Sequence, residues 1–435
     1  IYEYFLEEPL FLEQDAKELN QMAAKFSLAP DFFYRDQRME TLSGGEKVKA
    51  QLLRLLLSAP DLLLLDEPSN DIDLETMEWL ETFLLDWERI VFYISHDETL
   101  IRHTANIVIH LEQIRKKTQC RCTIARMPYE QYLKERSSQF ENQARMAANE
   151  RREKKLREEK YQRIYQSVDH AQAVITRQNP SKARLLKKKM HAVKSMERRF
   201  AREDAVMTQM PEEERAIFFK IGGDGSKIPS GKTVIDYGLE KLCTPDGETT
   251  LASNISLCIR GPQKVCIIGT NGAGKTTLLH QIAEELLART DIHAAYMPQN
   301  YEELLDPAMT PVDFLDQSGD QKIRTQIRTW LGALKFTADE TEHTVSQLSG
   351  GQKAKLFLLK LSLSGADVLL LDEPTRNFSP LSGPVIREML KNFEGAIISI
   401  SHDRNYIREV CDKVYRLTEH GLIEEPDVRE SVPLV

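Results

Sequence analysis

The stretch TLSGGEKVKAQLLRLLLSAPDLLLLDEPSN at residues 41–70 returns as QLSGGQKAKLFLLKLSLSGADVLLLDEPTR at residues 347–376. The offset between the copies is 306, and it also relates His96 to His402. In both copies, 23 positions separate the serine from the aspartate that ends the apolar run, and 30 separate that aspartate from the histidine. Self-similarity without a gap over this distance indicates that the chain contains two copies of one domain.

Each copy has the pattern of an α/β domain. LLLLDE and VLLLDE predict buried strands, as do VFYIS and IISIS, and stretches such as LETMEWLETFLLDW predict helices between them. Continuous apolar strands are typical of a parallel sheet that is covered on both faces. Ligands of such sheets bind beyond the carboxyl ends of the strands, which is where the acidic pairs and histidines of both copies fall.

Composition excludes several classes of protein. The chain has 435 residues, which predicts about three domains, and its formal charge of −9 argues against a uniformly basic nucleic-acid binder. No apolar run approaches the ~18 residues of a membrane span. The six cysteines are scattered, which favours free thiols over a disulfide framework. We therefore expect a soluble, cytoplasmic, multidomain protein that makes no contact with a membrane.

A phosphate-binding loop is predicted at GTNGAGKTTLL, residues 269–279. The motif follows the apolar run KVCIIG and opens a helix, which is the context that a P-loop requires. Glycines let backbone N–H groups close around phosphate oxygens, and the helix N-terminus adds its positive dipole end. The nucleotide-binding residues expected here are Gly269, Asn271, Gly272, Gly274, Lys275, Thr276 and Thr277.

The same copy supplies residues for a metal ion and for water. We expect Asp372 and Thr276 to hold Mg²⁺ and Glu373 to polarise the attacking water. His402 follows a strand and could contact the γ-phosphate, and Gln299 in YMPQNY is expected to sense the metal and the water. The first copy repeats this set, except for the glutamine, as Asp66, Glu67 and His96.

LSGGE, LSGGQ, the two strand-DEP motifs, SHD and GTNGAGKTT together resemble the ATP-binding-cassette superfamily. The resemblance implies two P-loop cassettes that pair head to tail within one monomer, with ATP and Mg²⁺ between the P-loop of one and the LSGG signature of the other. It further implies ATP hydrolysis. The signature residues would be Ser43, Gly44 and Gly45 for one site and Ser349, Gly350 and Gly351 for the other.

The first cassette has no P-loop within the chain. Residues 1–40 contain no glycine, and the offset places the missing loop about 38 residues before Ile1. The sequence is therefore expected to be an N-terminal truncation with one complete composite site, formed by the first signature and the P-loop at 269–276. No aromatic residue is evident for stacking on adenine.

Residues 129–210 differ in composition, with 20 Lys and Arg against 11 Asp and Glu. The segment 130–174 lacks Gly and Pro and predicts one long helix, QNPS at 178–181 predicts a turn, and a second helix is expected from about 181. Leu186, Met190, Val193 and Phe200 follow helical spacing. The expected domains are 1–128 for the first cassette, 129–210 for a helical hairpin linker and 211–435 for the second cassette.

The end of this hairpin is strongly basic. Residues 177–199 contain nine basic residues and one acidic residue. Charge of one sign suits a phosphate backbone, whereas the mixed charge at 150–160 is typical of a solvated helix face. The absence of aromatics at the loop favours recognition of RNA shape and charge. The predicted RNA-binding residues are Arg177, Lys182, Arg184, Lys187, Lys188 and Lys189.

Two cassettes joined by a basic hairpin of about 80 residues resemble the ABC-F family. That resemblance implies binding at the tRNA exit site of the ribosome, with the hairpin directed at large-subunit rRNA and peptidyl-tRNA. The absence of an arm before Ser43 and of a coiled coil after His402, and the unusual TRNFSPLS at 375–382, favour the branch that protects ribosomes from large-subunit antibiotics. A housekeeping translation factor is the alternative.

Two further classes of ATPase fit less well. The ATPase subunit of a membrane transporter would have a short uncharged linker, and chromosome or DNA-repair ATPases carry a coiled coil within one cassette or Cys-rich zinc modules.

One departure from the cassette pattern concerns the loop after each DEP motif, where Asp73 in the first copy corresponds to Ser379 in the second. We therefore expect communication between the two sites to be asymmetric.

Overall fold

The computed structural model describes residues 1–114, 118–174, 180–205, 207–208, 228–244, 247, 249–316 and 318–425. The chain forms two compact units, one made of Ile1–Ala105 with Glu214–Val435 and the other of Asn106–Glu213. Both cassettes lie in the first unit, and residues 106–128, which the prediction assigned to the first cassette, group with the linker.

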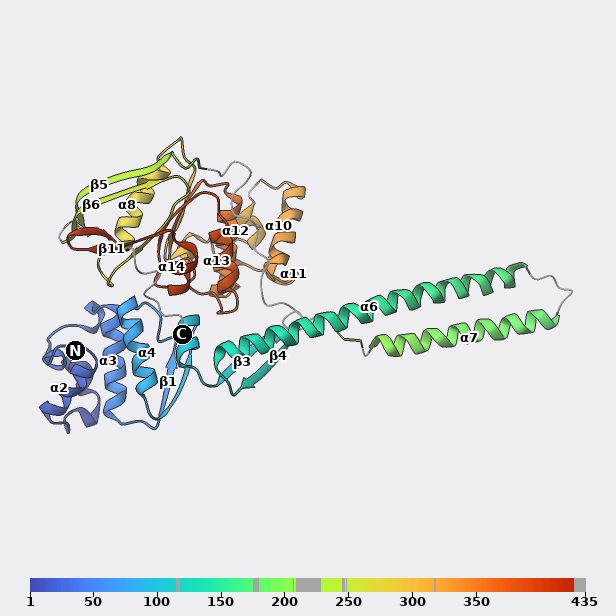
Figure 1. Ribbon diagram of the computed structural model, residues 1–435, viewed down its shortest axis with the longest axis horizontal. Coiled ribbons are helices and arrows are strands. Elements are labelled where there is room, and N and C mark those ends of the chain that lie inside the picture. Colours follow the sequence, from blue (N-terminus) through green and yellow to red (C-terminus); the bar gives the residue numbers. More distant parts are fainter. Residues whose placement is uncertain are drawn as a thin grey trace. The chain divides into compact units, whose positions relative to one another are not determined.

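The second cassette is a doubly covered α/β domain (Figure 1). Its central sheet has six strands in the order β12-β11-β7-β10-β9-β8, all parallel except β12, and β5 pairs with β6 in a separate antiparallel sheet. The strands are β5 (Thr233–Cys243), β6 (Thr250–Arg260), β7 (Lys264–Ile268), β8 (Ala294–Met297), β9 (Val368–Asp372), β10 (Ala396–Ile400), β11 (Lys413–Thr418) and β12 (Gly421–Glu424). The helices are α8 (Lys275–Leu287), α9 (Pro311–Leu315), α10 (Gln321–Ala333), α11 (Ala338–Glu342), α12 (Gly350–Leu363), α13 (Gly383–Lys391) and α14 (Arg404–Val410).

Alternate residues of β9 and β10 enter two different cores, as the period of a strand requires. Val368, Leu370 and Ile398 pack with α8 and the β5–β6 sheet, whereas Leu369 and Ile397 pack with α12 and α13. Every residue of β9 is buried. The predicted parallel sheet with both faces covered is therefore confirmed in the second cassette.

The first cassette has the equivalent second half of this fold. Its elements are α1 (Tyr2–Leu6), α2 (Ala16–Lys25), α3 (Gly44–Leu57), β1 (Leu62–Asp66), α4 (Leu74–Asp86), β2 (Ile90–Ile94) and α5 (Glu98–Thr104). Strands β1 and β2 pair in parallel, and α1 to α5 build a core around Phe5, Phe33 and Leu53.

One face of the β1–β2 pair does not have the predicted cover. Leu62, Leu64, Ile90, Phe92 and Ile94 are exposed, although their equivalents in β9 and β10 are buried. The physical reason is that α8, β5 and β6 bury that face in the second cassette, and no element in the described part of the chain does so in the first. The prediction of two covered faces is wrong for this pair of strands.

The other compact unit contains β3 (Val108–Ile114), β4 (Gln119–Ala125), α6 (Tyr129–Val174) and α7 (Pro180–Ala205). The two long helices predicted from composition are confirmed, and α6, with 46 residues, is about 69 Å long. Helices α6 and α7 run antiparallel, with Arg157 paired to Glu203 and Asp204 and the Tyr161 ring 6.0 Å from that of Phe200 (Figure 1). Val193 is buried and Leu186, Met190 and Phe200 are half-buried, so the expected apolar face is present. Residues 178–179 of the predicted turn lie outside the described residues, and α7 begins at Pro180, one residue earlier than expected, where the missing N–H of proline costs nothing.

Candidate ATP site

The P-loop lies between β7 and α8 and depends on left-handed backbone at its glycines. Gly272 and Gly274 have φ of 83° and 93°, conformations that residues with a Cβ rarely adopt. A Cβ at Gly274 would also lie 2.9 Å from the Leu251 side chain. The buried Lys275 ammonium donates to the carbonyl oxygens of Gly269 and Thr270 at 2.8 and 2.9 Å. Burial lowers the pKa of Lys275, and the nearby carboxylates of Glu373, Asp73 and Asp372 oppose that effect.

The acidic pair and the histidine place three polar atoms in the protein interior without hydrogen-bond partners in the protein. These atoms are Asp372 Oδ2, Glu373 Oε1 and His402 Nδ1. Glu373 has a left-handed backbone with φ of 52°, and its N–H donates to Ile400 at the end of β10 at 2.9 Å. Buried polar atoms in native proteins are normally paired, so this group fits a polar ligand such as Mg²⁺ with nucleotide phosphates.

Burial is the largest cause of the pKa shifts of Asp372, Glu373 and His402. It raises the pKa of Glu373 to about 8, with Asp372 as the next cause, and it lowers the pKa of His402 to about 4, with Lys275 as the next cause. Burial also raises the pKa of Asp372, against a hydrogen bond from Thr276 and the charge of Lys275. At neutral pH and without a ligand, Glu373 therefore holds a proton and His402 is neutral.

The signature of the first cassette faces this P-loop. Ser43 begins α3 with a capping box, in which its hydroxyl oxygen accepts from the Glu46 N–H at 3.2 Å and its own N–H donates to the Glu46 carboxylate at 3.1 Å. The Asn271 side chain donates to the Asp71 carbonyl at 2.7 Å, and its N–H donates to Asp73 at 3.3 Å. Contacts between residues about 200 positions apart therefore hold the two halves of the site together.

A cavity of about 1050 Å³ lies where these segments meet. Most of the residues predicted for the composite site line it. These are Ser43, Gly44, Asn271, Gly272, Gly274, Lys275, Thr276, Thr277, Gln299, Asp372, Glu373 and His402. Gly45 and Gly269 stand behind this lining, where Gly45 packs against Thr76 and Gly269 accepts from Lys275. Thr244 and Leu251 reach the cavity from the β5–β6 sheet.

The residues predicted for the second composite site are more open to solvent. His96 is close to Glu67, with Nε2 3.5 Å from the carboxylate, but its side chain is 50% exposed, against 17% for His402. Asp66 is exposed at the end of β1. His96 lines the same cavity as the first signature, whereas Glu67, Asp66, Ser349, Gly350 and Gly351 do not. Ser349 caps α12 with the same box that Ser43 forms.

The loops after the two DEP motifs differ at one pair of equivalent positions, which is Asp73 in the first cassette and Ser379 in the second. Asp73 caps α4 by accepting from the Thr76 N–H at 2.9 Å. Burial would raise the pKa of Asp73, but the hydrogen bonds from Thr76 and Asn271 outweigh it and lower the pKa. Ser379 instead pairs with Ser382 at 3.0 Å, and α13 has nine residues where α4 has 13. The loop of the first cassette thus contacts the P-loop through an anion that the second cassette lacks.

The structure describes four of the six basic side chains that are predicted to bind RNA. Arg184, Lys187, Lys188 and Lys189 are exposed on α7. Arg177 and the side chain of Lys182 lie outside the described residues. The RNA contacts expected of all six remain predictions.

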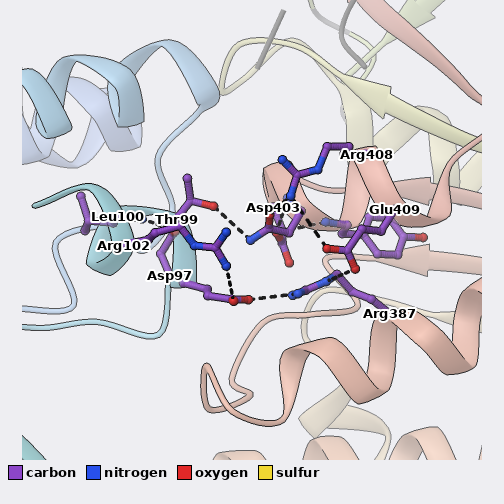
Figure 2. Close-up of polar contacts among 11 residues, drawn as sticks. Asp97, Thr99, Leu100, Arg102, Arg387, Asp403, Arg408 and Glu409 are labelled. Carbon is purple, nitrogen blue, oxygen red and sulfur yellow. Dashed lines mark hydrogen bonds and ion pairs between the residues drawn. The ribbon is translucent and has the colours of Figure 1, made fainter. Parts of the chain in front are cut away.

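Sequence reasoning missed a set of ion pairs between the two cassettes. Arg387 pairs with Glu98 at 3.0 Å, Arg404 pairs with Glu81, and Arg376 pairs with Asp71 at 2.9 Å. Figure 2 shows Arg387 between the first-cassette residues and Glu409. The sequence contained a sign of these ion pairs, because the 306-residue offset relates Glu81 to Arg387 and Glu98 to Arg404. Equivalent positions of the two cassettes therefore carry opposite charges.

Comparison with known proteins agrees with this geometry. The family model described as ABC transporter matches residues 3–70 and 252–376. The chain is 29% identical to ABC transporter F family member 5 of Arabidopsis thaliana over 94% of the chain and 56% of that protein. It is 31% identical to ATP-binding protein Uup of Haemophilus influenzae over 93% of the chain and 58% of that protein. The chain is therefore similar to ABC-F proteins and to ATP-binding proteins of the Uup type. It spans somewhat more than half the length of these curated relatives.

The fold of the chain also resembles solved structures. An archaeal ribosome recycling factor, aABCE1, solved in complex with the ribosomal stalk protein aP1, aligns with a TM-score of 0.53 at 16% identity over 96% of the chain and 70% of that protein. The expected fold of two ABC ATPase cassettes is therefore confirmed. Within the described residues, no helix has the length and apolarity needed to cross a bilayer.

Proposed function

We propose that the chain binds and hydrolyses ATP at the cavity between the first signature and the second P-loop, and that nucleotide binding controls its attachment to the ribosome. The observation that carries this proposal is the composition of the cavity wall. It combines a P-loop, an acidic pair with unpartnered buried oxygens, and a signature serine from the other cassette. In ABC ATPases, a wall of this kind surrounds Mg²⁺ and the phosphates of ATP.

The proposed chemistry follows from the side chains of this wall. When bound, Mg²⁺–ATP supplies the γ-phosphoryl group and positive charge that favours the ionised forms of Asp372 and Glu373. Lys275 and the P-loop N–H groups hold phosphate oxygens, and Asp372 with Thr276 holds the metal. Ionised Glu373 orients a water and takes its proton, and neutral His402 retains one N–H with which to donate.

Attachment to the ribosome is proposed from the hairpin and from the family. Exposed cations at Arg184 and Lys187 to Lys189 give α7 a surface for phosphates, and ABC-F proteins act at the tRNA exit site. We extend the proposal to large-subunit rRNA and peptidyl-tRNA as contacts of the hairpin. We further propose that the chain protects ribosomes from large-subunit antibiotics, with a housekeeping role in translation as the alternative.

The test uses the variant Glu67→Gln with Glu373→Gln, which retains the shape of both acidic sites and removes the proton acceptors. With ATP, we expect this variant to co-sediment with ribosomes and the unsubstituted chain to be released after hydrolysis. Glu388→Gln, at an exposed position on α13, is the matched control and should behave like the unsubstituted chain. Absence of the double variant from the ribosome pellet would contradict the ribosome proposal, while loss of ATP turnover alone would support only the ATPase.

Drug susceptibility separates the two biological roles. Expression of the chain in sensitive cells should raise the inhibitory concentration of at least one large-subunit antibiotic. An unchanged inhibitory concentration across these drugs, with ribosome binding intact, would favour the housekeeping role.

A further inference from the structure

The two cassettes meet through a pseudo-symmetric set of ion pairs. Arg404 forms a two-pronged contact with the Glu81 carboxylate, with Nη1 3.3 Å from Oε2 and Nη2 paired to Oε1. Arg387 Nη2 lies 3.0 Å from Glu98 Oε2. Positions 81 and 387 are equivalent in the repeat, as are 98 and 404. Each contact is therefore the image of the other, which is the pattern of a two-fold interface.

The contact between Thr99 and Asn405 shows where the two-fold axis of this interface lies. They are also equivalent positions of the repeat, and the Asn405 side chain donates to the Thr99 hydroxyl at 3.2 Å (Figure 2). A position that contacts its own equivalent lies on the axis that relates the two cassettes. The ion pairs stand on either side of it, on α4 with α14 and on α13 with α5.

The charges on this interface are segregated. Both carboxylates belong to the first cassette and both guanidinium groups to the second. Arg387 and Glu98 are only 5% and 9% exposed. Of the supporting residues, one pair of equivalent positions is segregated, because His103 contacts Glu81 within the first cassette and Glu409 contacts Arg387 within the second. The equivalent positions 102 and 408 are arginine in both cassettes, and Arg102 pairs with Glu98 at 2.9 Å.

Because the carboxylates lie on one cassette and the guanidinium groups on the other, two identical cassettes would bring like charges into contact. Two first cassettes brought together about this axis would oppose Glu81 to Glu98 twice, and two second cassettes would oppose Arg387 to Arg404 twice. Like charges in contact in a buried interface are strongly unfavourable, and such repulsion is how interfaces reject wrong partners. An interface with one Glu and one Arg in each cassette would tolerate all three pairings equally.

We propose that these residues determine which cassettes pair. The acidic face, Glu81 with Glu98, accepts only a cassette with arginine at the two equivalent positions, and so selects the second cassette over the first cassette of another copy. The same contacts connect the segments that follow His96 and His402, since Glu98 and Arg404 begin α5 and α14.

The test exchanges the three charged positions between the cassettes of the full chain. The exchange variant carries Glu81→Arg, Glu98→Arg, His103→Glu, Arg387→Glu, Arg404→Glu and Glu409→His. Each cassette then presents the residues that the other presents now. An acidic variant carries only Arg387→Glu and Arg404→Glu, and a basic variant carries only Glu81→Arg and Glu98→Arg. Glu75→Arg, at an exposed position that also contacts the other cassette through Arg416, is the control.

Hydrogen exchange of α5 and α14 measures pairing within the chain. We expect protection to fall at least about tenfold in the acidic and basic variants and to return in the exchange variant and the control. Sedimentation equilibrium measures pairing between chains, and we expect an equimolar mixture of the acidic and basic variants to form a 1:1 dimer.

Two hydrogen-exchange results would overturn the proposal. One is an exchange variant as unprotected as the acidic and basic variants, and this comparison stands even if those variants misfold on their own. The other is full protection in the acidic or basic variant, which would show that packing alone selects the partner. A mixture that remains monomeric while both variants are folded would also count against it.

Discussion

At the scale of single residues, the same strained backbone recurs at equivalent positions. Glu67 and Glu373 have positive φ, as do Asp71 and Asn377. Residues other than glycine adopt this conformation rarely, and it persists where the surroundings impose it, commonly at functional sites. Here it turns each glutamate back across the carboxyl end of its sheet, towards the histidine of its own cassette.

The protonation of Glu373 predicts a pH-dependent stability. Its pKa rises from 4.5 to about 8 on folding, so between these values the folded chain binds more protons than the unfolded chain. The contribution of Glu373 to the free energy of unfolding must therefore fall as pH rises from about 4.5 to 8. We expect Glu373→Gln to remove this loss and to stabilise the ligand-free cassette by about 4 kcal/mol at pH 8, with little effect at pH 4.

Hydrogen exchange of the β9 and β10 amides, measured at both pH values without nucleotide, checks this expectation. Glu388→Gln is the control. Equal stabilisation by Glu373→Gln at both pH values would show that the gain comes from packing and not from the lost proton equilibrium.

At the scale of elements, β1 and β9 have nearly the same sequence and very different surroundings. Leu64 is 66% exposed and Leu370 is 0% exposed, although the two are equivalent in the repeat. We expect Leu370→Ala to destabilise its cassette by about 2–5 kcal/mol, because it leaves a cavity in a closed core. Leu64→Ala should cost less than about 1 kcal/mol. Chemical denaturation of both variants measures the difference, and equal losses would mean that the face of β1 is covered in solution.

Helix α7 carries the prediction on nucleic acid. Reversing Lys187, Lys188 and Lys189 to Glu should abolish co-sedimentation of the Glu67→Gln, Glu373→Gln chain with ribosomes and leave ATP turnover of the otherwise unsubstituted chain unchanged. The matched control reverses Arg151, Arg152 and Lys155, which are exposed cations on the mixed-charge part of α6. Equal loss of binding in both triple variants would indicate a general charge effect, and loss of ATP turnover would indicate a folding role for the hairpin.

At the scale of the whole molecule, the cassette interface combines buried and exposed ion pairs. Arg387→Ala removes one of the two arginine partners of the buried Glu98 carboxylate and leaves Arg102, and we expect a loss of about 2–3 kcal/mol in the free energy of cassette pairing. Replacement of Arg416, which is 35% exposed and pairs with Glu75, by Ala should reduce the free energy of cassette pairing by less than about 1 kcal/mol. Hydrogen exchange of α5 measures both losses, and similar values would contradict a dominant role for the buried pair.

Most of the site was predictable because its parts are local. A P-loop needs a strand, a glycine turn and a helix in immediate succession, and a signature needs a capped helix, so both are evident in a short stretch of sequence. The cover of a strand face is not local. β1 and β9 share the pattern of a buried strand, and whether both faces are covered depends on elements that pack against them from elsewhere in the chain.

The sequence alone determined the repeat, the α/β class of both cassettes and the two long helices, and it predicted that the P-loop and the acidic pair belong to one site, where they line one cavity. Spacing and periodicity carry this information, because each feature follows from neighbours along the chain. Only the tertiary structure decided that Asn271 meets Asp71 and Asp73, that Glu81 and Glu98 face arginines, and that three polar atoms of the site are buried without hydrogen-bond partners in the protein. These are contacts and burials created by packing two domains together, and a single chain sequence does not record the axis about which they pack.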